Sequence, residues 1–532
     1  MIEINLNKVK KNYGFSNILS DISFEIKTNE KVALIGANGC GKTTILNIIA
    51  GLETIDDGTV SIRKDASIGV LTQLPKYNNE LVKDILYKGI ERELGLKEKL
   101  AVYEKKMLEA KSEDLDKVIV SYTKLQEQFI SIGGYELDSR IGKIMDIFSI
   151  DREFLDRKMT SLSGGEKTNV NLAAIILSNP DILLLDEPTN YLDIEKIEWL
   201  EEFLNQYKGT MLVVSHDRYF LDKVVTKTIL IEREQAEIFH GNYSYFLEEN
   251  ENRIMQEFKD YKSQQKQIEA IKATIKKLRE WGKIGDNEKF FKRANSMEKR
   301  LEKMEMLDKP EAKKEIPIDF DLRDRSGKDV IDIKNLSISF GDNPVFNNVS
   351  LEIKYGDKIC IIGPNGSGKT TLIKEILNGN SSIKIGANVI IGYIPQEIQF
   401  DDENLSILEE TRKYFDGQEQ YLRASLCKFL FSNQTILKKI KYLSGGEKIR
   451  LKLFCLMQKN HNFLIFDEPT NHIDIDTKEI LETALKKFAG TVLFISHDRY
   501  FINKLAKRIA CIDNHKIVSY IGNYDDYIRK LK

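Results

Sequence analysis

The sequence predicts an α/β protein in which two similar domains are joined by a long helical hairpin. A set of short motifs occurs twice with matching spacings, and each copy contains a buried strand that leads into a glycine-rich loop. The stretch between the copies is highly charged and carries apolar residues at helical spacing. We expect the first domain to span residues 1–247, the hairpin 248–314 and the second domain 315–532. A chain of 532 residues is long enough for two complete hydrophobic cores.

The composition is that of a globular protein, with 42% hydrophobic and 30% charged residues. No run of about 18 apolar residues is present, so we expect no membrane-spanning helix. The N-terminal residues lack the apolar segment of a secretory signal. The cysteines are isolated and form no CxxC pair, which argues against a zinc site; they are Cys40, Cys360, Cys427, Cys455 and Cys511. This usage fits a reducing compartment, so the sequence predicts a cytoplasmic protein.

The first glycine-rich loop has the pattern of a phosphate-binding loop. Lys31 to Ile35 (KVALI) is predicted to form a buried strand, and it leads directly into GANGCGKTT, which matches GxxxxGK[ST]. Glycines allow the backbone to wrap around phosphates, and the following helix directs unpaired N–H groups at them. We expect Lys42 to reach the β- and γ-phosphates and Thr43 to bind Mg²⁺. The candidate phosphate-binding residues are Gly36, Asn38, Gly39, Gly41, Lys42, Thr43 and Thr44.

Polar side chains follow two further predicted strands of the first domain. Asp186 and Glu187 come directly after the strand ILLL, and His216 follows the strand MLVVS. Residues at the carboxyl ends of parallel strands lie in the crevice where ligands bind. We expect Asp186 on the Mg²⁺ side and Glu187 to polarise the attacking water, with His216 at the same edge. The alternative for the histidine is a core residue with its hydrogen bonds satisfied.

The second domain repeats every one of these features. In each copy the glutamate precedes the histidine by 29 residues, and an aromatic residue, Tyr13 or Phe340, precedes the first loop glycine by 23. Both copies also contain Gly-Asn-Tyr near their ends. Such regularity indicates an internal duplication. The second set of candidates is Gly363, Asn365, Gly366, Gly368, Lys369, Thr370, Thr371, Asp467, Glu468 and His497.

A further motif, LSGGEK, occurs at 162–167 and 443–448. The S-x-x-E spacing is that of a helix-capping box, but capping does not explain two consecutive glycines, which destabilise a helix. Together with the phosphate-binding loop, DEPTN and SHD, this motif resembles the signature of ATP-binding-cassette ATPases. The resemblance covers nearly the whole chain.

The resemblance implies two cassettes that close face to face, with each ATP between the phosphate-binding loop of one cassette and the signature of the other. It implies that Tyr13 and Phe340 stack on adenine and that Asp193 and Asp474 are D-loop residues.

Gln73 and Gln396 resemble the glutamines that contact Mg²⁺ and water. Site 1 would combine the first cassette's loop, Asp186, Glu187 and His216 with Ser444, Gly445 and Gly446. Site 2 would combine the second cassette's loop, Asp467, Glu468 and His497 with Ser163, Gly164 and Gly165. Both sites match the hydrolytic pattern, so ATP hydrolysis to ADP and phosphate is expected at each.

Among ATP-binding-cassette proteins the chain resembles the ABC-F family, which has tandem cassettes, no membrane part and a helical linker. DEPTN followed by any residue, a leucine or isoleucine, and Asp (DEPTNYLD and DEPTNHID), and SHDRYF in both halves, support this resemblance. Gln73 and Ser163 are 90 residues apart, whereas Gln396 and Ser444 are 48 apart, so the first cassette contains an insertion at about 81–130. In ABC-F proteins this arm contacts the large ribosomal subunit near the exit site. The alternative is a solvated helical pair.

The predicted hairpin is basic, with fourteen Lys or Arg and seven Asp or Glu between Lys259 and Lys303. Its formal charge of +7 contrasts with −2 for the whole chain. We expect two helices of about 30 residues, each about 45 Å long, around a break that contains Gly282 and Gly285. Positive charge among aromatics favours RNA, although a solvated coiled-coil spacer is the alternative. The candidate RNA-binding residues are Lys276, Lys277, Arg279, Trp281, Lys283, Lys289, Phe290, Lys292 and Arg293.

The ABC-F resemblance implies a monomer that enters the exit site of the ribosome when ATP closes the cassettes. The hairpin would contact large-subunit rRNA and point at P-site tRNA and the peptidyl-transferase centre, and hydrolysis would release the protein. Two roles fit: antibiotic resistance by ribosomal protection, or a housekeeping translation factor that relieves stalled or idle ribosomes. The sequence ends shortly after Gly522 without a basic extension, which favours resistance. A nucleic-acid or transport adaptor with no ribosomal target is a third hypothesis.

Overall fold

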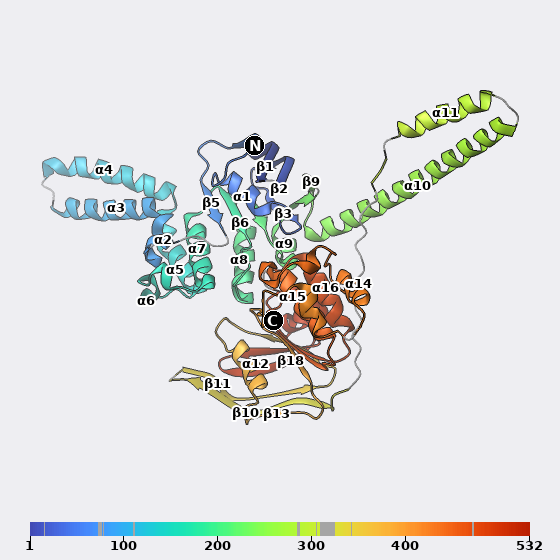
Figure 1. Cartoon of the computed structure of the whole chain (residues 1–532). Helices are drawn as coiled ribbons and strands as arrows, with labels where there is room; N and C mark the ends of the chain where they lie inside the picture. The colour runs from blue at the N-terminus through green and yellow to red at the C-terminus, as the bar shows by residue number, and fades with distance from the viewer. Residues whose placement is uncertain are drawn as a thin grey trace. The chain divides into compact units, whose positions relative to one another are not determined.

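The computed structural model describes the chain except residues 15, 73–76, 78, 110–111, 233, 285–287, 305, 309–324, 342, 416, 471–472 and 532. It divides into two compact units, one formed by Met1–Asn242 with Ile316–Lys532 and the other by Tyr243–Glu315 (Figure 1). The first unit contains both cassettes, and the second contains the helical hairpin. Gln73 lies outside the described residues.

The first cassette contains a six-stranded sheet and a smaller antiparallel sheet. The order of the large sheet is β5(Ile68–Leu71), β6(Ile182–Asp186), β7(Thr210–Val214), β3(Lys31–Gly36), β8(Lys227–Glu232) and β9(Gln235–Phe239). All its neighbouring strands are parallel except β8 and β9. The small sheet has the order β2(Ser16–Lys27), β1(Ile2–Tyr13) and β4(Asp57–Ile62). Strands β6 and β7 are buried along their whole length, as their continuous apolar sequences predict.

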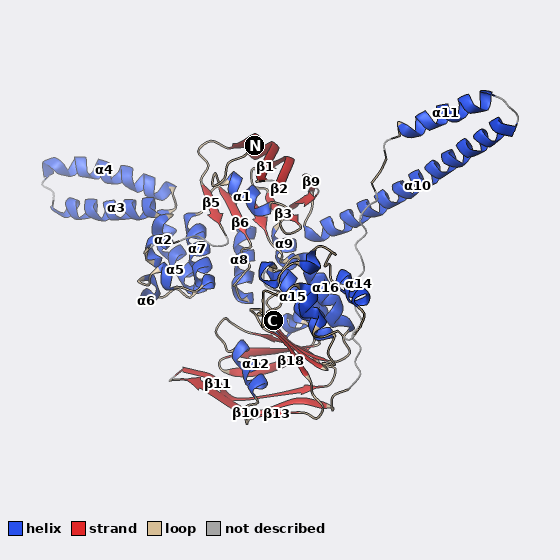
Figure 2. Cartoon of the chain, viewed as in Figure 1, coloured by secondary structure: helices blue, strands red, loops and turns tan. Residues whose placement is uncertain are grey.

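The second cassette has the same topology. Its large sheet has the order β14(Ile391–Ile394), β15(Phe463–Asp467), β16(Thr491–Ile495), β12(Lys358–Ile362), β17(Arg508–Asp513) and β18(Lys516–Ile521). Its small sheet has the order β11(Asn343–Lys354), β10(Asp329–Phe340) and β13(Ile383–Ile385). The predicted α/β fold with a duplicated cassette is therefore confirmed (Figure 2).

Helices flank the sheets and place the motifs at the carboxyl ends of the strands. Those of the first cassette are α1(Lys42–Ile49), α2(Val82–Lys88), α3(Glu91–Glu109), α4(Ser112–Ser131), α5(Leu137–Phe148), α6(Arg152–Leu155), α7(Gly164–Ser178), α8(Ile194–Gln206) and α9(Arg218–Val224). Those of the second are α12(Lys369–Asn378), α13(Ile407–Arg412), α14(Glu419–Lys428), α15(Gly445–Met457), α16(Ile475–Lys487), α17(Arg499–Leu505) and α18(Tyr524–Leu531). Because β3, β6 and β7 are adjacent and parallel, the segments that follow them meet at one edge of the sheet.

The insertion in the first cassette is a helical pair formed by α3 and α4. Leu96, Leu100 and Phe129 form its small core, and Tyr122 and Leu125 pack against them. Figure 1 shows the two helices side by side. In the second cassette, the helices between Gln396 and the signature are the short helices α13 and α14, of which α13 corresponds to α2.

The hairpin consists of α10(Tyr243–Ile284), with 42 residues, and α11(Glu288–Glu302), with 15. The expectation of two equal helices is wrong: the first would span about 60 Å at 1.5 Å per residue. Ile275, Leu278 and Ala294 form the contact between them.

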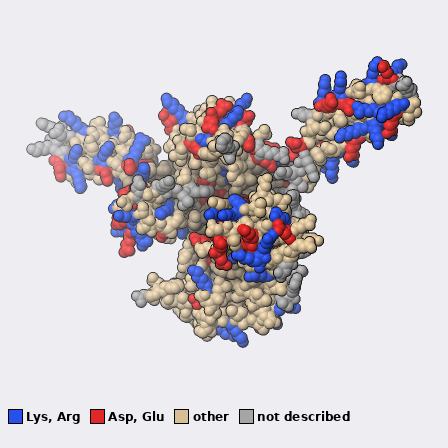
Figure 3. All heavy atoms as spheres, viewed as in Figure 1, with Lys and Arg blue, Asp and Glu red and all other residues tan. Residues whose placement is uncertain are grey.

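Gly282 is not part of a break, contrary to the sequence-based prediction. It lies inside α10, and a Cβ there would come within 2.7 Å of the Phe291 ring. The glycine therefore allows an aromatic side chain to pack closely against the helix. Gly285 lies outside the described residues. Figure 3 shows Lys and Arg side chains over the hairpin, interspersed with acidic ones.

Among the residues described, none of the helices is both long and apolar enough to cross a membrane.

Candidate active site

The two phosphate-binding loops have almost the same backbone. Gly41 and Gly368 both have φ of 95°, in the left-handed region that favours glycine. A Cβ on Gly41 would also lie 2.6 Å from Leu19, so no larger residue fits without a shift. The Lys42 ammonium donates to the carbonyls of Gly36 and Ala37 at 2.8 and 2.9 Å, and Lys369 makes the equivalent bonds in the second loop. Each lysine is thus held over the hollow of its own loop, where phosphates would lie.

A threonine and an aspartate meet at each loop, as the sequence predicts for a metal site. The Thr43 hydroxyl donates to Asp186 Oδ2 at 2.8 Å, and the Thr370 hydroxyl donates to Asp467 Oδ1 at 3.3 Å. Asp467 is almost fully buried, and burial is the main reason that its pKa is raised to about 6. Its second oxygen, Oδ2, is buried without a hydrogen-bond partner.

Glu187 and His216 form a buried pair in site 1. The backbone N–H of His216 donates to Glu187 Oε2 at 3.2 Å, and the ring Nε2 lies 3.6 Å from Oε1. Burial, followed by the charge of Asp186, raises the pKa of Glu187 to about 8. Burial, followed by the positive charges of Lys42 and Lys478, lowers the pKa of His216 to about 3. Without nucleotide, the pair is therefore favoured with a proton on the carboxyl and a neutral imidazole at pH 7.

Site 2 contains the same pair, and the described residues there also include the predicted glutamine. His497 Nε2 lies 3.6 Å from Glu468 Oε1, and the Gln396 amide donates to Glu468 Oε2 at 3.0 Å. The structure thus brings the predicted glutamine to the catalytic candidate. Glu187 and Glu468 have φ of 51° and 49°, a strained conformation for a residue other than glycine, and such strain is concentrated at functional sites.

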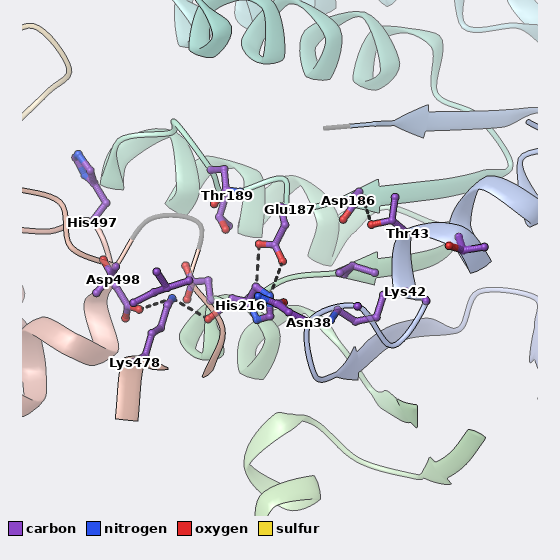
Figure 4. A pocket seen from close by; sticks show the side chains of 18 of the residues that line it. Asn38, Lys42, Thr43, Asp186, Glu187, Thr189, His216, Lys478, His497 and Asp498 are labelled. Carbon is purple, nitrogen blue, oxygen red and sulfur yellow. Dashed lines mark hydrogen bonds and ion pairs between the residues drawn. The ribbon is translucent and has the colours of Figure 1, made fainter. Parts of the chain in front are cut away.

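A cavity of about 430 Å³ lies at site 1 and is lined by both cassettes (Figure 4). The first cassette contributes its phosphate-binding loop, Tyr13, Asp186, Glu187 and His216. The second cassette contributes Thr470, Ile473, Lys478, His497 and Asp498.

The phosphate-binding loops also contact the opposite D-loops. The Asn38 amide donates to Asp474 at 3.3 Å, and the Asn365 amide donates to the carbonyl of Tyr191 at 3.1 Å. The backbone N–H of Asn365 donates to Asp193 at 3.5 Å.

The signature serines cap helices, so the capping box that the S-x-x-E spacing suggests is confirmed. Ser163 and Glu166 exchange the two bonds of a capping box at the start of α7, and Ser444 and Glu447 do so at α15. The second glycine of each motif packs near the D-loop helix: a Cβ on Gly165 would lie 3.2 Å from Tyr191, and one on Gly446 would lie 3.5 Å from Thr477.

The first signature glycines, Gly164 and Gly445, face open space. Of the described residues that line the site 1 cavity, none belongs to the second signature. The phosphate-binding loops thus contact the opposite D-loops, and the predicted approach of the signature residues to the nucleotide stays a prediction.

The aromatic residues proposed for adenine stacking are accessible at the ends of β1 and β10. Tyr13 is 47% exposed and its hydroxyl donates to Glu53, whereas Phe340 is 64% exposed. Thr44 and Gly39 line the cavity beside Tyr13.

The proposed RNA-binding cations of the hairpin are all exposed. Trp281 is 55% exposed and meets the edge of Phe290, with ring centroids 6.1 Å apart. Arg279 is paired with Glu298 at 2.6 Å, and Lys292 with Glu288 at 3.3 Å.

Sequence reasoning missed the contacts that the SHDRYF motifs make across the cassettes. Arg499 is fully buried, donates with both terminal nitrogens to Glu201 and lies over the Tyr219 ring, 4.4 Å from its centroid. Arg218 lies over the Tyr500 ring at 4.9 Å.

Arg218 also reaches α16 of the second cassette. It donates to the Ile475 carbonyl at 3.1 Å and lies 3.7 Å from both Glu479 and Glu482. We call Arg218, Tyr219, Arg499 and Tyr500, with these acidic partners, the arginine interlock. The only sequence signal for it was the repetition of the motif.

The fold and the duplicated site define a tandem ATP-binding-cassette protein. A family model described as ABC transporter matches residues 19–190 and 346–471, and a second model with the same description matches 229–320.

Several relatives align along almost the whole chain. Putative ATP-binding protein YdiF of Bacillus subtilis is 36% identical, over 100% of this chain and 83% of the relative. ABC transporter F family member 5 of Arabidopsis thaliana is 34% identical, over 99% and 77%. Energy-dependent translational throttle protein EttA of Escherichia coli K12 is 33% identical, over 96% and 92%.

Solved structures show the same fold. One from the complex of archaeal ribosomal stalk protein aP1 and archaeal ribosome recycling factor aABCE1 has a TM-score of 0.63 at 18% identity, covering 98% of this chain and 92% of that chain. The RNase-L Inhibitor has a TM-score of 0.62 at 19% identity, covering 99% and 92%.

The chain therefore belongs to the ABC-F family of ATP-binding-cassette proteins. It binds ATP and is an ATPase.

Proposed function

We propose that this chain is a cytoplasmic, ribosome-binding translation factor that uses ATP to enter the tRNA exit site as a monomer and leaves after hydrolysis. The observation that carries the proposal is the cavity at site 1, whose walls come from both cassettes. A nucleotide bound there would contact both cassettes, so binding can favour one arrangement of the two over another. EttA, a relative over almost the full length, is described as an energy-dependent translational throttle protein.

The residues at each loop fit Mg²⁺. Thr43 with Asp186, and Thr370 with Asp467, offer a hydroxyl and a carboxylate at hydrogen-bond distance, and Asp467 has a buried oxygen without a partner. Oxygen ligands of this kind are what Mg²⁺ prefers, with nucleotide phosphates completing its shell. Bound Mg²⁺ would neutralise phosphate charge. We assign Gln73 and Gln396 as additional contacts to the metal and to water.

The remaining residues supply positioning and proton transfer. Lys42 and Lys369 would exchange their loop carbonyls for phosphate oxygens, and Tyr13 and Phe340 would hold adenine. With nucleotide and metal bound, Glu187 and Glu468 would accept the proton of the attacking water. His216 and His497 would orient them. The signature glycines would approach the phosphates from the opposite cassette when the cassettes close.

The helical elements supply the RNA contacts in this proposal. The exposed cations around Trp281 would contact large-subunit rRNA and P-site tRNA, because excess positive charge binds phosphates and an exposed aromatic ring stacks on bases. The arm formed by α3 and α4 would contact the large subunit near the exit site.

Co-sedimentation tests ribosome binding. With ATP, the double variant Glu187→Gln/Glu468→Gln should accumulate in the ribosome pellet, because blocked hydrolysis holds the bound state. The double variant Lys42→Ala/Lys369→Ala, which lacks the phosphate-binding ammonium groups, is the matched control and should stay in the supernatant. Absence of the first variant from the pellet would reject the ribosomal function and favour a nucleic-acid or transport adaptor.

The hairpin is tested separately. Trp281→Ala or Lys283→Glu should weaken sedimentation with ribosomes and leave ATP hydrolysis by the isolated protein unchanged. Lys516→Glu, an exposed change of the same charge on β18, is the control. Unchanged sedimentation of both variants would show that Trp281 and Lys283 are not part of the RNA-binding surface.

Within this function, two finer roles differ in their target. The modest arm formed by α3 and α4 favours protection of the ribosome from antibiotics, whereas the similarity to EttA favours a translation factor without a drug role. Expression in a susceptible host separates them. Unchanged inhibitory concentrations for lincosamides, pleuromutilins, streptogramin A, phenicols and oxazolidinones would reject protection.

A further inference from the structure

At one buried position in the cassette interface, the two cassettes carry residues of different chemistry. Ten residues after the catalytic candidate, the first cassette has Ile197 and the second has Lys478. Both side chains are buried, with relative exposures of 2% and 5%, and both line the cavity at site 1. A buried ammonium is costly unless it is paired, so its partners define its role.

Lys478 connects the two histidine loops. Its ammonium donates to the carbonyl oxygen of His216 at 3.0 Å and to the carboxylate of Asp498 at 2.8 Å (Figure 4). Asp498 in turn accepts from the backbone N–H of Phe501 at 3.0 Å and so caps α17. One end of this connection belongs to the first cassette and the other to the second.

The bond to His216 affects the site 1 carboxyl directly. The carbonyl that Lys478 holds and the N–H that donates to Glu187 Oε2 belong to the same residue, His216. The carbonyl and the N–H belong to the two peptide groups that meet at the Cα of His216, so holding the carbonyl restricts movement of the backbone at this residue and thereby the position of the N–H. The ring of His216, 3.6 Å from Glu187, is fixed by the same backbone.

Site 2 lacks the equivalent restraint from this position. Ile197 has no donor, so it cannot bind the carbonyl of His497 as Lys478 binds that of His216. Asp217, the counterpart of Asp498, caps α9 through the backbone N–H of Phe220. The positive charge of Lys478 also contributes to the low pKa of His216, behind burial and Lys42.

We propose that Lys478 is a positioning residue from the second cassette that orients the His216–Glu187 pair and makes hydrolysis at site 1 differ from hydrolysis at site 2. Reacting groups lose rate steeply when their orientation is relaxed, whereas ATP binding depends mainly on the phosphate-binding loop. Lys478 therefore acts on the hydrolytic step of site 1.

The test measures one site at a time, because the inference rests on the proposed roles of Glu187 and Glu468. The full chain carrying Glu468→Gln hydrolyses only at site 1, and the chain carrying Glu187→Gln hydrolyses only at site 2. Single-turnover release of phosphate from γ-labelled ATP gives the rate constant, and titration with ATP gives the dissociation constant. If the double glutamine variant still hydrolyses ATP, the proposed carboxylate roles fail, independently of Lys478.

Lys478→Ile makes the two positions alike. We expect the rate constant of site 1 to fall about tenfold, that of site 2 to change less than about threefold, and the dissociation constants to stay within about threefold. Lys478→Arg, which retains the charge and donors, should recover most of the rate. The variant Lys478→Ile/Ile197→Lys moves the lysine to the first cassette, where it would face the loop of His497. The hydrolysis rate of site 2 should then rise relative to that of site 1.

Lys478→Ile leaves the buried Asp498 carboxylate without its cation, so the fold needs a control. Lys478→Ile/Asp498→Asn removes that charge while an amide can still cap α17. We expect this variant to unfold at the same temperature as the chain with Lys478 and Asp498 intact. We expect its hydrolysis rate at site 1 to stay as low as that of Lys478→Ile. Recovery of the site 1 rate in this variant, an equal loss at both sites, or a loss in ATP affinity without a loss in rate would overturn the proposal.

Discussion

The two cassettes share the same motifs, yet they surround their catalytic candidates differently. Lys478 of the second cassette binds the carbonyl of His216, whose N–H donates to Glu187, whereas the equivalent position of the first cassette is Ile197, which has no donor. The loops differ little, since the glycines that shape them have nearly equal φ angles. The difference therefore lies in side chains that come from neighbouring segments and from the opposite cassette, and the comparison shows that a duplicated motif does not give a duplicated environment.

The largest expected effect comes from replacing the candidate catalytic glutamate of each site. Glu187→Gln and Glu468→Gln should each lower hydrolysis at their own site by about 100- to 10,000-fold, because the amide cannot accept a proton from water. Phosphate release with one blocked site at a time measures the effect. A variant that hydrolyses at the parental rate at its own site would remove that glutamate from the catalytic residues.

The arginine interlock offers a second comparison. Arg499→Ala should lower the unfolding free energy by about 3–5 kcal/mol, because it leaves the buried Glu201 without its main partner. Arg218→Ala should cost less, about 1–3 kcal/mol, because its carboxylate partners are 3.7 Å away and Glu479 is partly exposed.

Urea unfolding measures both changes. Arg529→Ala, which removes an exposed pair on α18, is the control and should change the free energy by less than about 0.5 kcal/mol. Equal losses for Arg218→Ala and Arg499→Ala would show that the interlock is symmetric in energy despite its geometry.

The raised pKa of Glu187 predicts a pH dependence of stability without nucleotide. Between its ordinary value of 4.5 and about 8, the folded protein retains a proton that the unfolded chain has released. The unfolding free energy should therefore fall as the pH rises through this range, with a contribution of up to about 1.4 kcal/mol per pH unit. Glu187→Gln has no titrating group there and should lose this contribution.

Thermal unfolding between pH 5 and pH 8 measures the slope. Glu98→Gln removes an exposed carboxylate from α3 and should keep the slope of the parent. If Glu187→Gln keeps that slope as well, the proton is not held on this carboxyl.

The smallest predicted effect concerns the signature caps. Ser163→Ala and Ser444→Ala should each lower the unfolding free energy by about 1 kcal/mol, because each removes a side-chain bond to a helix N-terminus. The two losses should be equal, since the capping geometry is the same in both cassettes. A difference of more than about 1 kcal/mol between them would show that the asymmetry of the interface extends to the signatures.

Much of the fold and of the site was predictable because the signals are local. The loop around Lys42, the carboxylates after β6 and the histidine after β7 each follow a continuous apolar strand. The apolar stripe that contains Ile275 and Leu278 predicted helix packing in the hairpin. The lengths of the hairpin helices were not predictable, because the same stripe fits a break at Gly282 or a helix that continues through it.

The sequence by itself determined the duplication and the α/β class, and it supplied the candidates for phosphate, metal and water chemistry, since short spacings along one strand or one turn define these motifs. Only the tertiary structure decided that Lys478 lies against His216, that Arg499 crosses to Glu201, and that Gly282 makes room for Phe291. These contacts join segments far apart in the chain. Pairing and packing must offset the cost of removing these groups from water, and the partners are fixed only when the two cassettes, or the two helices of the hairpin, have packed together.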